Sequence, residues 1–349
     1  MSTEDSQTQH SMAILLQTLR ERLAELVATL HPSLSADVLQ ALKAKGKLLS
    51  QPPSPGEHAS SSTVIGMWPL LTLLVAQAVS PQVDLFCASG VAVAVECFVC
   101  ALDLLDDVED GDLTPTVNAL GIARALNVST ALLALAQKAI HSLSTRDVSS
   151  VLVLRLLDAM QEATLLATSG QHRDLLVEQQ SLHEFTTGES LELVIEKCLE
   201  IARGKAGSIM RLACRLGAMG AGADNELLEQ FSLLGEQLGI AHQLHNDCHD
   251  LYDFLSSSGA QEDTTQKKSD MARGKKTLPI VLAHTLQEST TGTDIENYED
   301  VHALQRGILA AWGIRLLYRE RVRSCLELIQ AGSTELHIAP PLRHLLDVD

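Results

Sequence analysis

Apolar residues recur at the three- and four-residue intervals of a helix along most of this chain, and this pattern limits the fold more than any other feature. Leu, Ala, Gln and Glu, which favour helices, are abundant. Aromatic residues make up only 3% of the sequence, and the alternation of β-branched and polar residues that is typical of strands is scarce. The sequence therefore predicts a single all-α domain with an N-terminal extension.

The same pattern predicts where the helices and loops fall. Helices are expected at 12–30, 35–47 (with Ser35 as N-cap), 68–80, 85–108, 116–142, 149–168, 177–188, 190–219, 224–255, 276–288 and 300–331. Loops rich in Pro, Ser, Gly or polar residues are expected at 50–63, 256–266 and 289–299, and Pro340-Pro341 is expected to limit the last helix. The predicted boundary separates an N-terminal helical extension and linker (1–60) from the main domain (61–349).

The segment from Ala101 to Asp110 places four aspartates at one end of an apolar helical stretch. They are spaced three, four and seven residues apart and therefore share one helical face: Asp103, Asp106, Asp107 and Asp110. Like charges on adjacent turns repel one another, so a positive partner has to offset them. Hard oxygen ligands in this number suit Mg2+, which prefers one or two carboxylates, waters and a substrate phosphate. Taken alone, the segment is also compatible with a solvated helix end.

A second polar cluster follows about 140 residues later, again in an apolar helical context. One helical face carries polar side chains at intervals of four, with two more beside it: His242, Asn246 and Asp250, with Gln243 and Asp247. Two acidic helix faces of this kind would be able to hold one metal cluster across a cavity.

Charge and cysteine content exclude several classes of protein. The net charge of −18 argues against binding nucleic acid or an anionic membrane surface, and it fits a protein that attracts cations and, through them, an anionic substrate. Seven cysteines without a regular framework are typical of reduced cytoplasmic thiols. The sequence has no N-terminal signal pattern and no apolar run of the ~20 residues that a membrane span needs. We therefore expect a soluble, cytoplasmic protein.

Five motifs in collinear order resemble the trans-isoprenyl diphosphate synthase (polyprenyl synthetase) superfamily between about residues 64 and 335. Asp106-Asp107-Val-Glu-Asp110 resembles the DDxxD motif, Gly170-Gln171-His-Arg-Asp174-Leu175 resembles GQxxDL, and Lys205-Ala-Gly-Ser-Ile resembles a lysine-containing element. Gly239 to Asp250 resembles the second aspartate motif, with Asn246 replacing its first aspartate. Gly274-Lys275-Lys-Thr-Leu-Pro279 resembles GKxTxP. Each motif alone is a weak signal, but five in order are specific. The resemblance implies an isoprenoid-synthase-type helical bundle with a central cavity, and residues 61–349 as its catalytic domain.

The resemblance also implies a set of site residues. The metal ligands would be Asp106, Asp107, Asp110, Asn246, Asp247 and Asp250, holding three Mg2+ ions. The residues that contact the prenyl diphosphate substrate would be Lys205, Lys275, Gln171, Gln243, Phe98, Ala101 and Leu102, and Asp106, Asp110, Lys205 and Lys275 would act in catalysis. This agrees with the chemistry, because a diphosphate leaves only when its charge is neutralised and the resulting cation needs a site without water. A homodimer is expected from the resemblance alone.

The cations with which chain-elongating members of the superfamily bind a second substrate, isopentenyl diphosphate, are absent from the matching positions. Gly66-Met67-Trp68-Pro69 stands in place of a GKR-type element and Val99 in place of a histidine, and the stretch from Gly111 to Thr116 lacks the arginine pair that follows DDxxD. Each charged hydrogen bond to phosphate contributes roughly 1.5–3 kcal/mol. Losing about four of them should abolish useful affinity for that second anion.

Three functions fit these observations. The first is a terpene synthase-like activity, in which an allylic diphosphate of C15–C20 or longer is ionised and then cyclised or eliminated. Asn246 favours it, whereas the shortage of aromatic residues (Phe98, Trp68 and Phe86 are the candidates) weakens it. The alternative is a prenyltransferase, either a polyprenyl diphosphate synthase or a ComQ-like enzyme that modifies a peptide or other acceptor. The third is a non-catalytic subunit, against which the intact metal motifs argue.

Other residues have two interpretations each. His242, His245 and His249, together with Cys248, raise the possibility of zinc, although their spacing does not signal a tetrahedral set. Arg173 and Arg203 are either diphosphate ligands or surface ion pairs, and Lys267 and Lys268 either close over the substrate or belong to a solvated loop. Asp103 has no role that the resemblance assigns.

Overall fold

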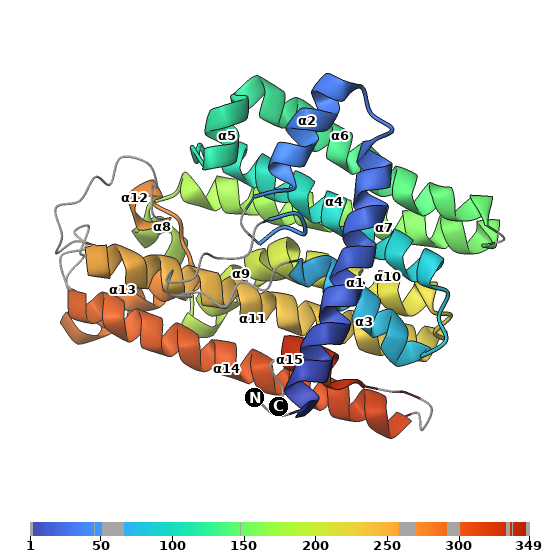
Figure 1. Cartoon of the computed structure of the whole chain (residues 1–349). Coiled ribbons are helices and arrows are strands. Elements are labelled where there is room, and N and C mark those ends of the chain that lie inside the picture. Colours follow the sequence, from blue (N-terminus) through green and yellow to red (C-terminus); the bar gives the residue numbers. More distant parts are fainter. Residues whose placement is uncertain are drawn as a thin grey trace. The chain divides into compact units, whose positions relative to one another are not determined.

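Every element in the part of the chain that the structure describes is a helix (Figure 1). The structure is a computed structural model and describes residues 3–44, 46–50, 66–146, 148–257, 270–291, 301–332, 336 and 338–346. Its helices are α1 (Thr3–Val27), α2 (Pro32–Ala41), α3 (Met67–Val79), α4 (Leu85–Glu109), α5 (Pro115–Leu120), α6 (Ile122–His141), the 3₁₀ turn η1 (Ser142–Thr145), α7 (Ser150–Glu178), α8 (Leu182–Thr186), α9 (Leu191–Ala202), the π-helical turn η2 (Arg203–Gly207), α10 (Ser208–Gly220), α11 (Asn225–Ser257), α12 (Asp270–Arg273), α13 (Leu278–Thr291), α14 (Val301–Gly332) and α15 (Pro340–Leu346). The all-α prediction is confirmed.

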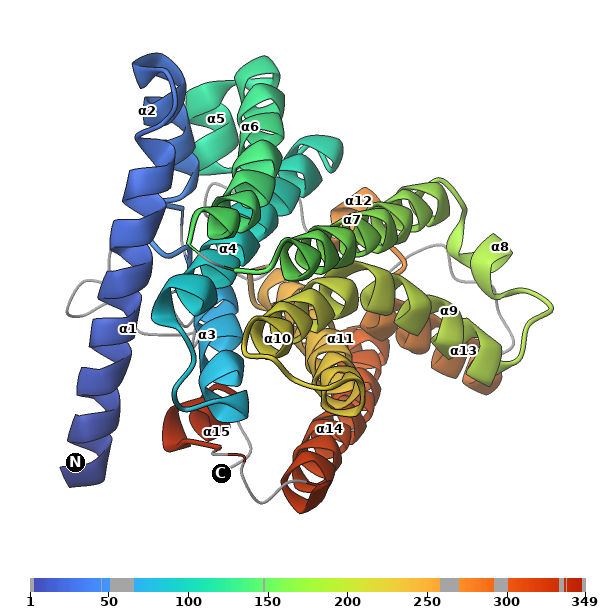
Figure 2. The ribbon, with the colours of Figure 1, turned by 90° about the vertical axis from the view of Figure 1, so that its right-hand side faces the viewer.

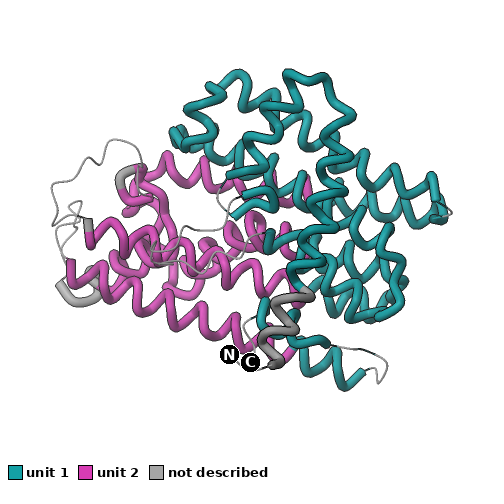
Figure 3. The backbone as a smooth tube through the Cα atoms, in the orientation of Figure 1, with its two compact units in different colours: residues 1–162, 212–233, 325–349 teal, residues 163–211, 234–324 magenta. Residues whose placement is uncertain are grey.

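The chain divides into two compact units, which Figure 3 shows in different colours. Unit 1 comprises residues 1–162, 212–233 and 325–349, and unit 2 comprises residues 163–211 and 234–324. The described part of the predicted N-terminal extension belongs to unit 1.

Helix α4 forms the core of unit 1, where it packs against α1, α3 and α6 (Figure 2). Its small and apolar residues are buried without interruption from Cys87 to Ala101. The Asp84 carboxylate caps the start of the helix by accepting a hydrogen bond from the Phe86 N–H at 3.0 Å. Only the last turns of α4 carry several acidic side chains, so the apolar part anchors the acidic part.

A glycine ends α4 directly after the acidic cluster. Gly111 adopts a φ of +68°, a conformation that side chains rarely tolerate. The N–H of Asp112 donates to the Asp107 carbonyl at 2.7 Å, and the N–H of Gly111 donates to the Val108 carbonyl at 3.2 Å. This pair of bonds is a Schellman cap. The helix therefore ends within one residue of Asp110.

By length and composition, α4 is also the one helix among the described residues that would be able to cross a membrane. Its most apolar window is 83% buried by the rest of the protein, and the buried residues include Glu96. No apolar run long enough to span a membrane was expected from the sequence, and α4 is longer and more apolar than that expectation implied. Such burial is typical of a core helix.

A short segment before α3 is held against the start of that helix. The N–H of Gly66 donates to the Gly46 carbonyl at 2.9 Å, and both glycines have positive φ angles, +63° and +81°. Arg20 of α1 fixes the same segment, since its Nε donates to the Leu48 carbonyl at 2.9 Å. Residues 46–50 therefore lie beside the Gly66 end of α3 although they are far from it in sequence.

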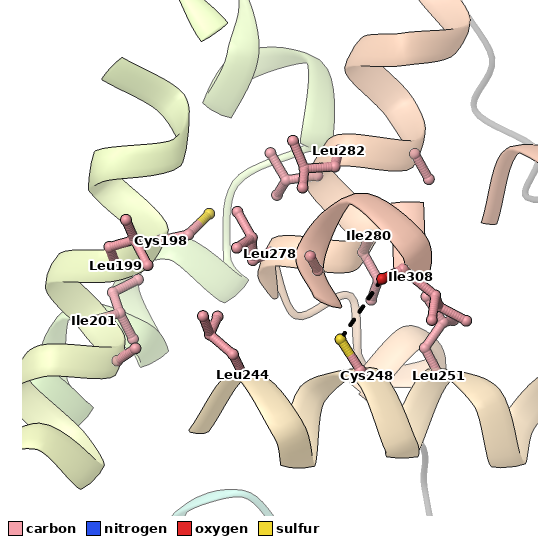
Figure 4. Packing of buried hydrophobic residues seen from close by; sticks show 14 of the residues in the cluster. Cys198, Leu199, Ile201, Leu244, Cys248, Leu251, Leu278, Ile280, Leu282 and Ile308 are labelled. Carbon is pink, nitrogen blue, oxygen red and sulfur yellow. Dashed lines mark hydrogen bonds between the residues drawn. The ribbon is translucent and has the colours of Figure 1, made fainter. Parts of the chain in front are cut away.

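Unit 2 is held together by an apolar cluster shared by α9, α11, α13 and α14 (Figure 4). The labelled members come from all four helices: Cys198, Leu199, Ile201, Leu244, Cys248, Leu251, Leu278, Ile280, Leu282 and Ile308. Cys248 Sγ also donates to the Ile308 carbonyl at 4.0 Å, which links α11 to α14. This core gives the polar side chains of α11 a rigid support.

Backbone-to-backbone contacts bring the helices of unit 2 unusually close. A Cβ on Gly170 of α7 would lie 2.6 Å from the carbonyl carbon of Gly204 in η2. A Cβ on Gly239 of α11 would lie 2.3 Å from the Ala206 carbonyl oxygen. The π-helical turn η2 is therefore packed between α7 and α11 at positions that only glycine permits.

Some predicted boundaries were wrong for identifiable reasons. Helix α2 begins at Pro32 with His31, and not Ser35, as its cap, because proline fits the first turn of a helix. Helix α7 continues to Glu178 instead of ending at 168, so the predicted helix 177–188 is reduced to α8. The predicted helix 190–219 is interrupted by η2.

The predicted loops extend into residues that the structure does not describe. Residues 256–257 still belong to α11 and residues 289–291 to α13, so these helices end later than predicted. The rest of both loops, Lys267 and Lys268, and residues 51–65 of the predicted linker lie outside the described residues. Pro340-Pro341 begin α15.

The close approach at Gly170 generates a test of the packing of unit 2. Gly170→Ala should lower the free energy of unfolding by about 1–3 kcal/mol, because the added methyl group meets the backbone of Gly204. Gly313→Ala in α14 is the matched control, since a Cβ at this position would meet nothing within 4 Å and alanine should raise helix stability by up to about 1 kcal/mol. Urea unfolding measures both. Equal stability of the two variants would contradict the packing constraint.

Candidate active site

The acidic ladder of unit 1 consists of Asp103, Asp106, Asp107 and Asp110 at the end of α4. Asp106 and Asp107 are half-buried within the helix, and Asp110 is its C-cap residue. The predicted shared face is therefore present, and it ends at the Schellman cap. The ladder lies next to apolar turns that are fully buried, as the sequence predicted.

The carboxylate of Asp107 is the most constrained in the ladder. Burial raises the pKa of Asp107 to about 6; the Thr114 hydroxyl, which donates to Oδ2 at 2.9 Å, opposes this, and the neighbouring aspartates add to it. Thr114 is also the N-cap of α5, so its hydroxyl joins the ladder to the next helix. A nearby cation would stabilise the ionised form of the Asp107 carboxylate and lower its pKa.

A lysine outside the five motifs lies at the first rung of the ladder. The Lys47 ammonium pairs with the Asp103 carboxylate, and it is almost fully buried. On α4, Glu96 is seven residues before Asp103 and accepts a hydrogen bond from the Leu48 N–H at 2.6 Å. The motif that the resemblance assigns to the region of Gly66 contains cations, which this chain lacks there. The hydrogen bond from Gly66 to Gly46 instead brings Lys47, the residue after Gly46, close to Gly66.

The predicted prenyl-binding residues of α4 have different environments. Phe98 and Ala101 are fully buried, and Leu102 is half-buried. Phe86 is unsuited to steadying a cation near the ladder, because Arg22 and Arg146 already lie over its ring at 3.9 and 4.6 Å. It is also about 30 Å along the helix from the acidic ladder at 1.5 Å per residue.

In unit 2, the two predicted lysines converge on one carboxylate. Lys205 Nζ lies 2.8 Å from Asp174 Oδ2, and Lys275 Nζ lies 3.8 Å from the same oxygen. Lys205 belongs to η2, Asp174 to α7, and Lys275 to the segment before α13. The side chains are largely buried, with 14% of Lys205, 8% of Lys275 and 13% of Asp174 exposed. The structure therefore brings Lys205 and Lys275 together beside Asp174, and their contact with a diphosphate stays a prediction.

The second aspartate motif joins this group through α11. Gln243 Nε2 donates to Asp247 Oδ1 at 2.8 Å, and Asp250 Oδ2 accepts the Asp270 N–H at 2.9 Å. Asp270 in turn lies 3.8 Å from Lys275. Asn246 is exposed on the same helix. We call the connected set the lysine–aspartate network: Asp174, Lys205, Asp247, Asp250, Asp270 and Lys275.

Negative charge in the network exceeds what the two lysines offset. Burial raises the pKa of Asp247 to about 8, Asp270 and Asp174 add to the shift, and the Gln243 hydrogen bond opposes it. Burial also raises the pKa of Asp270 to about 6 in spite of Lys275. Asp247 therefore binds a proton at neutral pH.

The donor chemistry of both units fits Mg2+. Asp107, Asp247 and Asp270 have raised pKa values because they are buried with too little positive charge nearby, which a divalent cation would supply. Within the described ranges, no group of three or more His, Cys, Asp or Glu side chains forms a ready-made metal cage. Mg2+ does not require one, because it binds through one or two carboxylates, waters and substrate phosphates.

The histidines of α11 form an aromatic contact with α14. The rings of His245 and His249 lie 4.3 Å apart, and that of His245 lies 5.5 Å from Trp312. Burial lowers the pKa of His245 to about 4, and Arg315 adds to this effect. His245 is therefore neutral and packs as an aromatic side chain.

The two arginines considered as diphosphate ligands lie in surface ion pairs. Arg173 contacts Glu200 at 2.7 Å, with about half of each side chain exposed. Arg203 contacts Glu196 at 3.2 Å and Glu236 at 3.7 Å. Gln171, three residues before Asp174 on α7, stays a predicted substrate ligand.

Sequence reasoning missed four residues of these groups. Asp174 was visible inside its motif but had no assigned role, and Asp270 precedes Lys275 by five residues without a motif of its own. No sequence motif marked Lys47 or Thr114, because only the fold brings them to their partners Asp103 and Asp107. The contact between Lys47 and Asp103 spans 56 residues.

The sequence is similar to those of known proteins of one family. The sequence model of the polyprenyl synthetase family matches residues 65–306. Geranylgeranyl diphosphate synthase from Mycobacterium tuberculosis is 30% identical over 201 residues, which are 56% of this chain and 52% of that protein. Tryptophan prenyltransferase ComQ from Bacillus spizizenii is 28% identical over 187 residues, 53% of this chain and 54% of that protein.

The fold has close counterparts among solved structures. Geranylgeranyl pyrophosphate synthetase from the archaeon Geoglobus acetivorans matches with a TM-score of 0.67 at 22% identity, covering 98% of this chain and 97% of that one. This likeness shows an isoprenyl synthase helical bundle. In sequence, the chain spans about half the length of the relatives that it matches.

The raised pKa of Asp247 predicts how stability depends on pH. A carboxyl that binds its proton more tightly in the folded state stabilises the protein fully below its unfolded pKa of about 4, and this contribution is lost as pH rises to about 8. In the presence of a chelator, the free energy of unfolding should therefore fall from pH 5 to 8, and Asp247→Asn should flatten this fall. An unchanged slope in the variant would refute the assignment. Chemical denaturation at several pH values measures it.

Proposed function

The chain belongs to the polyprenyl synthetase family, and we propose that it is a Mg2+-dependent prenyltransferase that ionises a preformed allylic prenyl diphosphate and passes the prenyl group to an acceptor. The observation that carries this proposal is the convergence of Lys205 and Lys275 on Asp174 in unit 2. Two buried ammonium groups within reach of one carboxylate oxygen would both be able to contact a diphosphate that enters together with Mg2+.

The lysines act on the leaving diphosphate. A diphosphate that enters with Mg2+ would accept charge-assisted hydrogen bonds from Lys205 and Lys275, which lie close together beside Asp174. Negative charge builds up on the diphosphate as the carbon–oxygen bond breaks. The lysines bind this state more strongly than the intact substrate and so lower the barrier.

Each unit contains carboxylates that would hold Mg2+. Bound Mg2+ would neutralise the diphosphate and so make it a better leaving group. In unit 1 the ligands would be Asp106, Asp107 and Asp110, and in unit 2 Asn246, Asp247 and Asp250. Gln243 orients Asp247 through its hydrogen bond, and Asp250 is oriented by the Asp270 N–H. The family as a whole depends on Mg2+.

The cations that are missing from the family pattern bear on which molecule accepts the prenyl group. Val99 is fully buried on α4, and Gly111 and Asp112 form the Schellman cap, so these positions supply no cation. The relatives are named for both kinds of acceptor: a geranylgeranyl diphosphate synthase and a tryptophan prenyltransferase. We therefore propose an acceptor other than isopentenyl diphosphate, such as a peptide side chain or another neutral nucleophile.

Cyclisation or elimination, the function expected first from the sequence, receives less support. The relatives transfer prenyl groups according to their names, and Phe86, one of three candidate aromatic residues, is already covered by arginines. A substrate of C15–C20 or longer, three Mg2+ ions, a homodimer and a cytoplasmic location belong to the same proposal. They rest on the family resemblance.

Product analysis separates these functions. We expect incubation with farnesyl or geranylgeranyl diphosphate and Mg2+ to yield diphosphate and a prenylated product only when a nucleophilic acceptor, such as a tryptophan-containing peptide, is added. Isopentenyl diphosphate should not be elongated. A hydrocarbon or alcohol formed without acceptor would show cyclisation or elimination instead, and a longer prenyl diphosphate would show elongation. No consumption of any prenyl diphosphate would refute enzymatic activity.

The lysine pair provides a second test. Lys205→Met and Lys275→Met should each lower kcat/KM for the allylic diphosphate by about 10²–10³, the range for removing one preorganised donor. Arg173→Met is the matched control, because Arg173 lies in an exposed ion pair, and it should stay within about threefold of wild type. Thermal unfolding confirms that each variant is folded. Lysine variants as active as the control would exclude the diphosphate receptor.

A further inference from the structure

The segment that carries Lys47 is fixed on three sides within unit 1. Arg20 Nε donates to the Leu48 carbonyl at 2.9 Å, and the Leu48 N–H donates to Glu96 Oε1 at 2.6 Å. The Gly46 carbonyl accepts the Gly66 N–H at 2.9 Å. The backbone on both sides of Lys47 is therefore held, and the lysine side chain is directed to α4 by the fold.

The pair between Lys47 and Asp103 is asymmetric in its burial. The Lys47 side chain is 9% exposed, whereas 54% of the Asp103 side chain is exposed. Burial alone would lower the pKa of Lys47, but Asp103, with Cys100 and Glu96, outweighs it and the pKa lies above its ordinary value. Lys47 is thus a permanent positive charge at the first rung of the acidic ladder.

Stability alone does not account for this lysine. Asp103 is exposed enough to be hydrated without a partner, and buried ion pairs are often no more stable than apolar residues of similar volume. The pair does, however, change the charge of the ladder. Asp103 lies three and four residues before Asp106 and Asp107 on the same face of α4, so that its charge acts directly on theirs.

We propose that Lys47 is the internal counter-ion of the acidic ladder, which holds Asp103 out of the metal-binding set and thereby sets the affinity of the ladder for divalent cations. The inference rests on the proposed function in one respect: the ladder has to bind a divalent cation. Lys47 is then a positioning residue, because it acts through Asp103 without touching the substrate. The cation is bound by the three remaining carboxylates, Asp106, Asp107 and Asp110.

A charge cycle with Mn2+ as the probe tests this role. Free Mn2+ is measured by electron paramagnetic resonance in titrations of the wild type, Lys47→Met, Asp103→Asn and the double variant. Lys47→Met leaves one more uncompensated carboxylate and should bind Mn2+ about fivefold more tightly. Asp103→Asn leaves an ammonium without its carboxylate and should bind about fivefold more weakly. The double variant restores the net charge and should return to within about twofold of wild type.

The controls separate this role from a structural one. Arg124→Met removes a cation from an exposed ion pair with Asp37 elsewhere in unit 1, and it should leave Mn2+ affinity unchanged. Damage to the fold would shift both single variants in the same direction and would not be rescued in the double variant, so that pattern overturns the proposal. Equal affinity in all four proteins also overturns it. A wild type that binds no Mn2+ overturns the metal assignment of the proposed function as well, whereas wild-type binding without a charge effect refutes only the role of Lys47.

Discussion

The carboxylate of Asp174, shared by Lys205 and Lys275, is the interaction on which the candidate site of unit 2 depends. Two buried ammonium groups repel each other unless an anion lies between them. Asp174 supplies that anion from α7, whose backbone meets η2 at Gly170 and Gly204. The contact between Gly170 and Gly204 therefore allows α7 to approach η2 closely enough for Asp174 Oδ2 to lie near both lysines.

In the acidic ladder of unit 1 and in the lysine–aspartate network of unit 2, carboxylates outnumber lysines. In unit 1, one buried lysine faces the ladder, and Asp107 has a pKa of about 6. In unit 2, two lysines lie beside buried carboxylates, of which Asp247 has a pKa of about 8. The carboxylates of each unit are therefore short of positive charge. A divalent cation would supply that charge in either unit.

The sequence predicted the parts of this arrangement that depend on local periodicity. The helical face of the ladder and the face of α11 follow from spacing, whereas the proximity of Lys205 to Lys275 is known only from the fold. The role of Lys47 was not predicted, because its partner Asp103 is 56 residues away in sequence. Its position also depends on the hydrogen bond between Gly46 and Gly66. Helix boundaries failed where a local rule competed with the periodic pattern, as at Pro32, or where the pattern did not show continuity, as in α7 beyond residue 168. The π-helical turn η2 was not predicted, because α9 and α10 flank it directly and no loop separates them within 190–219.

The end of α4 depends on glycine directly after the acidic ladder. Gly111 at φ +68° makes the Schellman cap possible, and a side chain at this position would be strained. A larger residue in place of Gly111 would therefore weaken the cap that ends the helix at Asp110, and with it the contact from Thr114 to Asp107. Because Asp110 is the C-cap residue of α4, the same change would also disturb the last carboxylate of the ladder. The geometry of the acidic ladder thus depends on the backbone conformation of the residue that follows it.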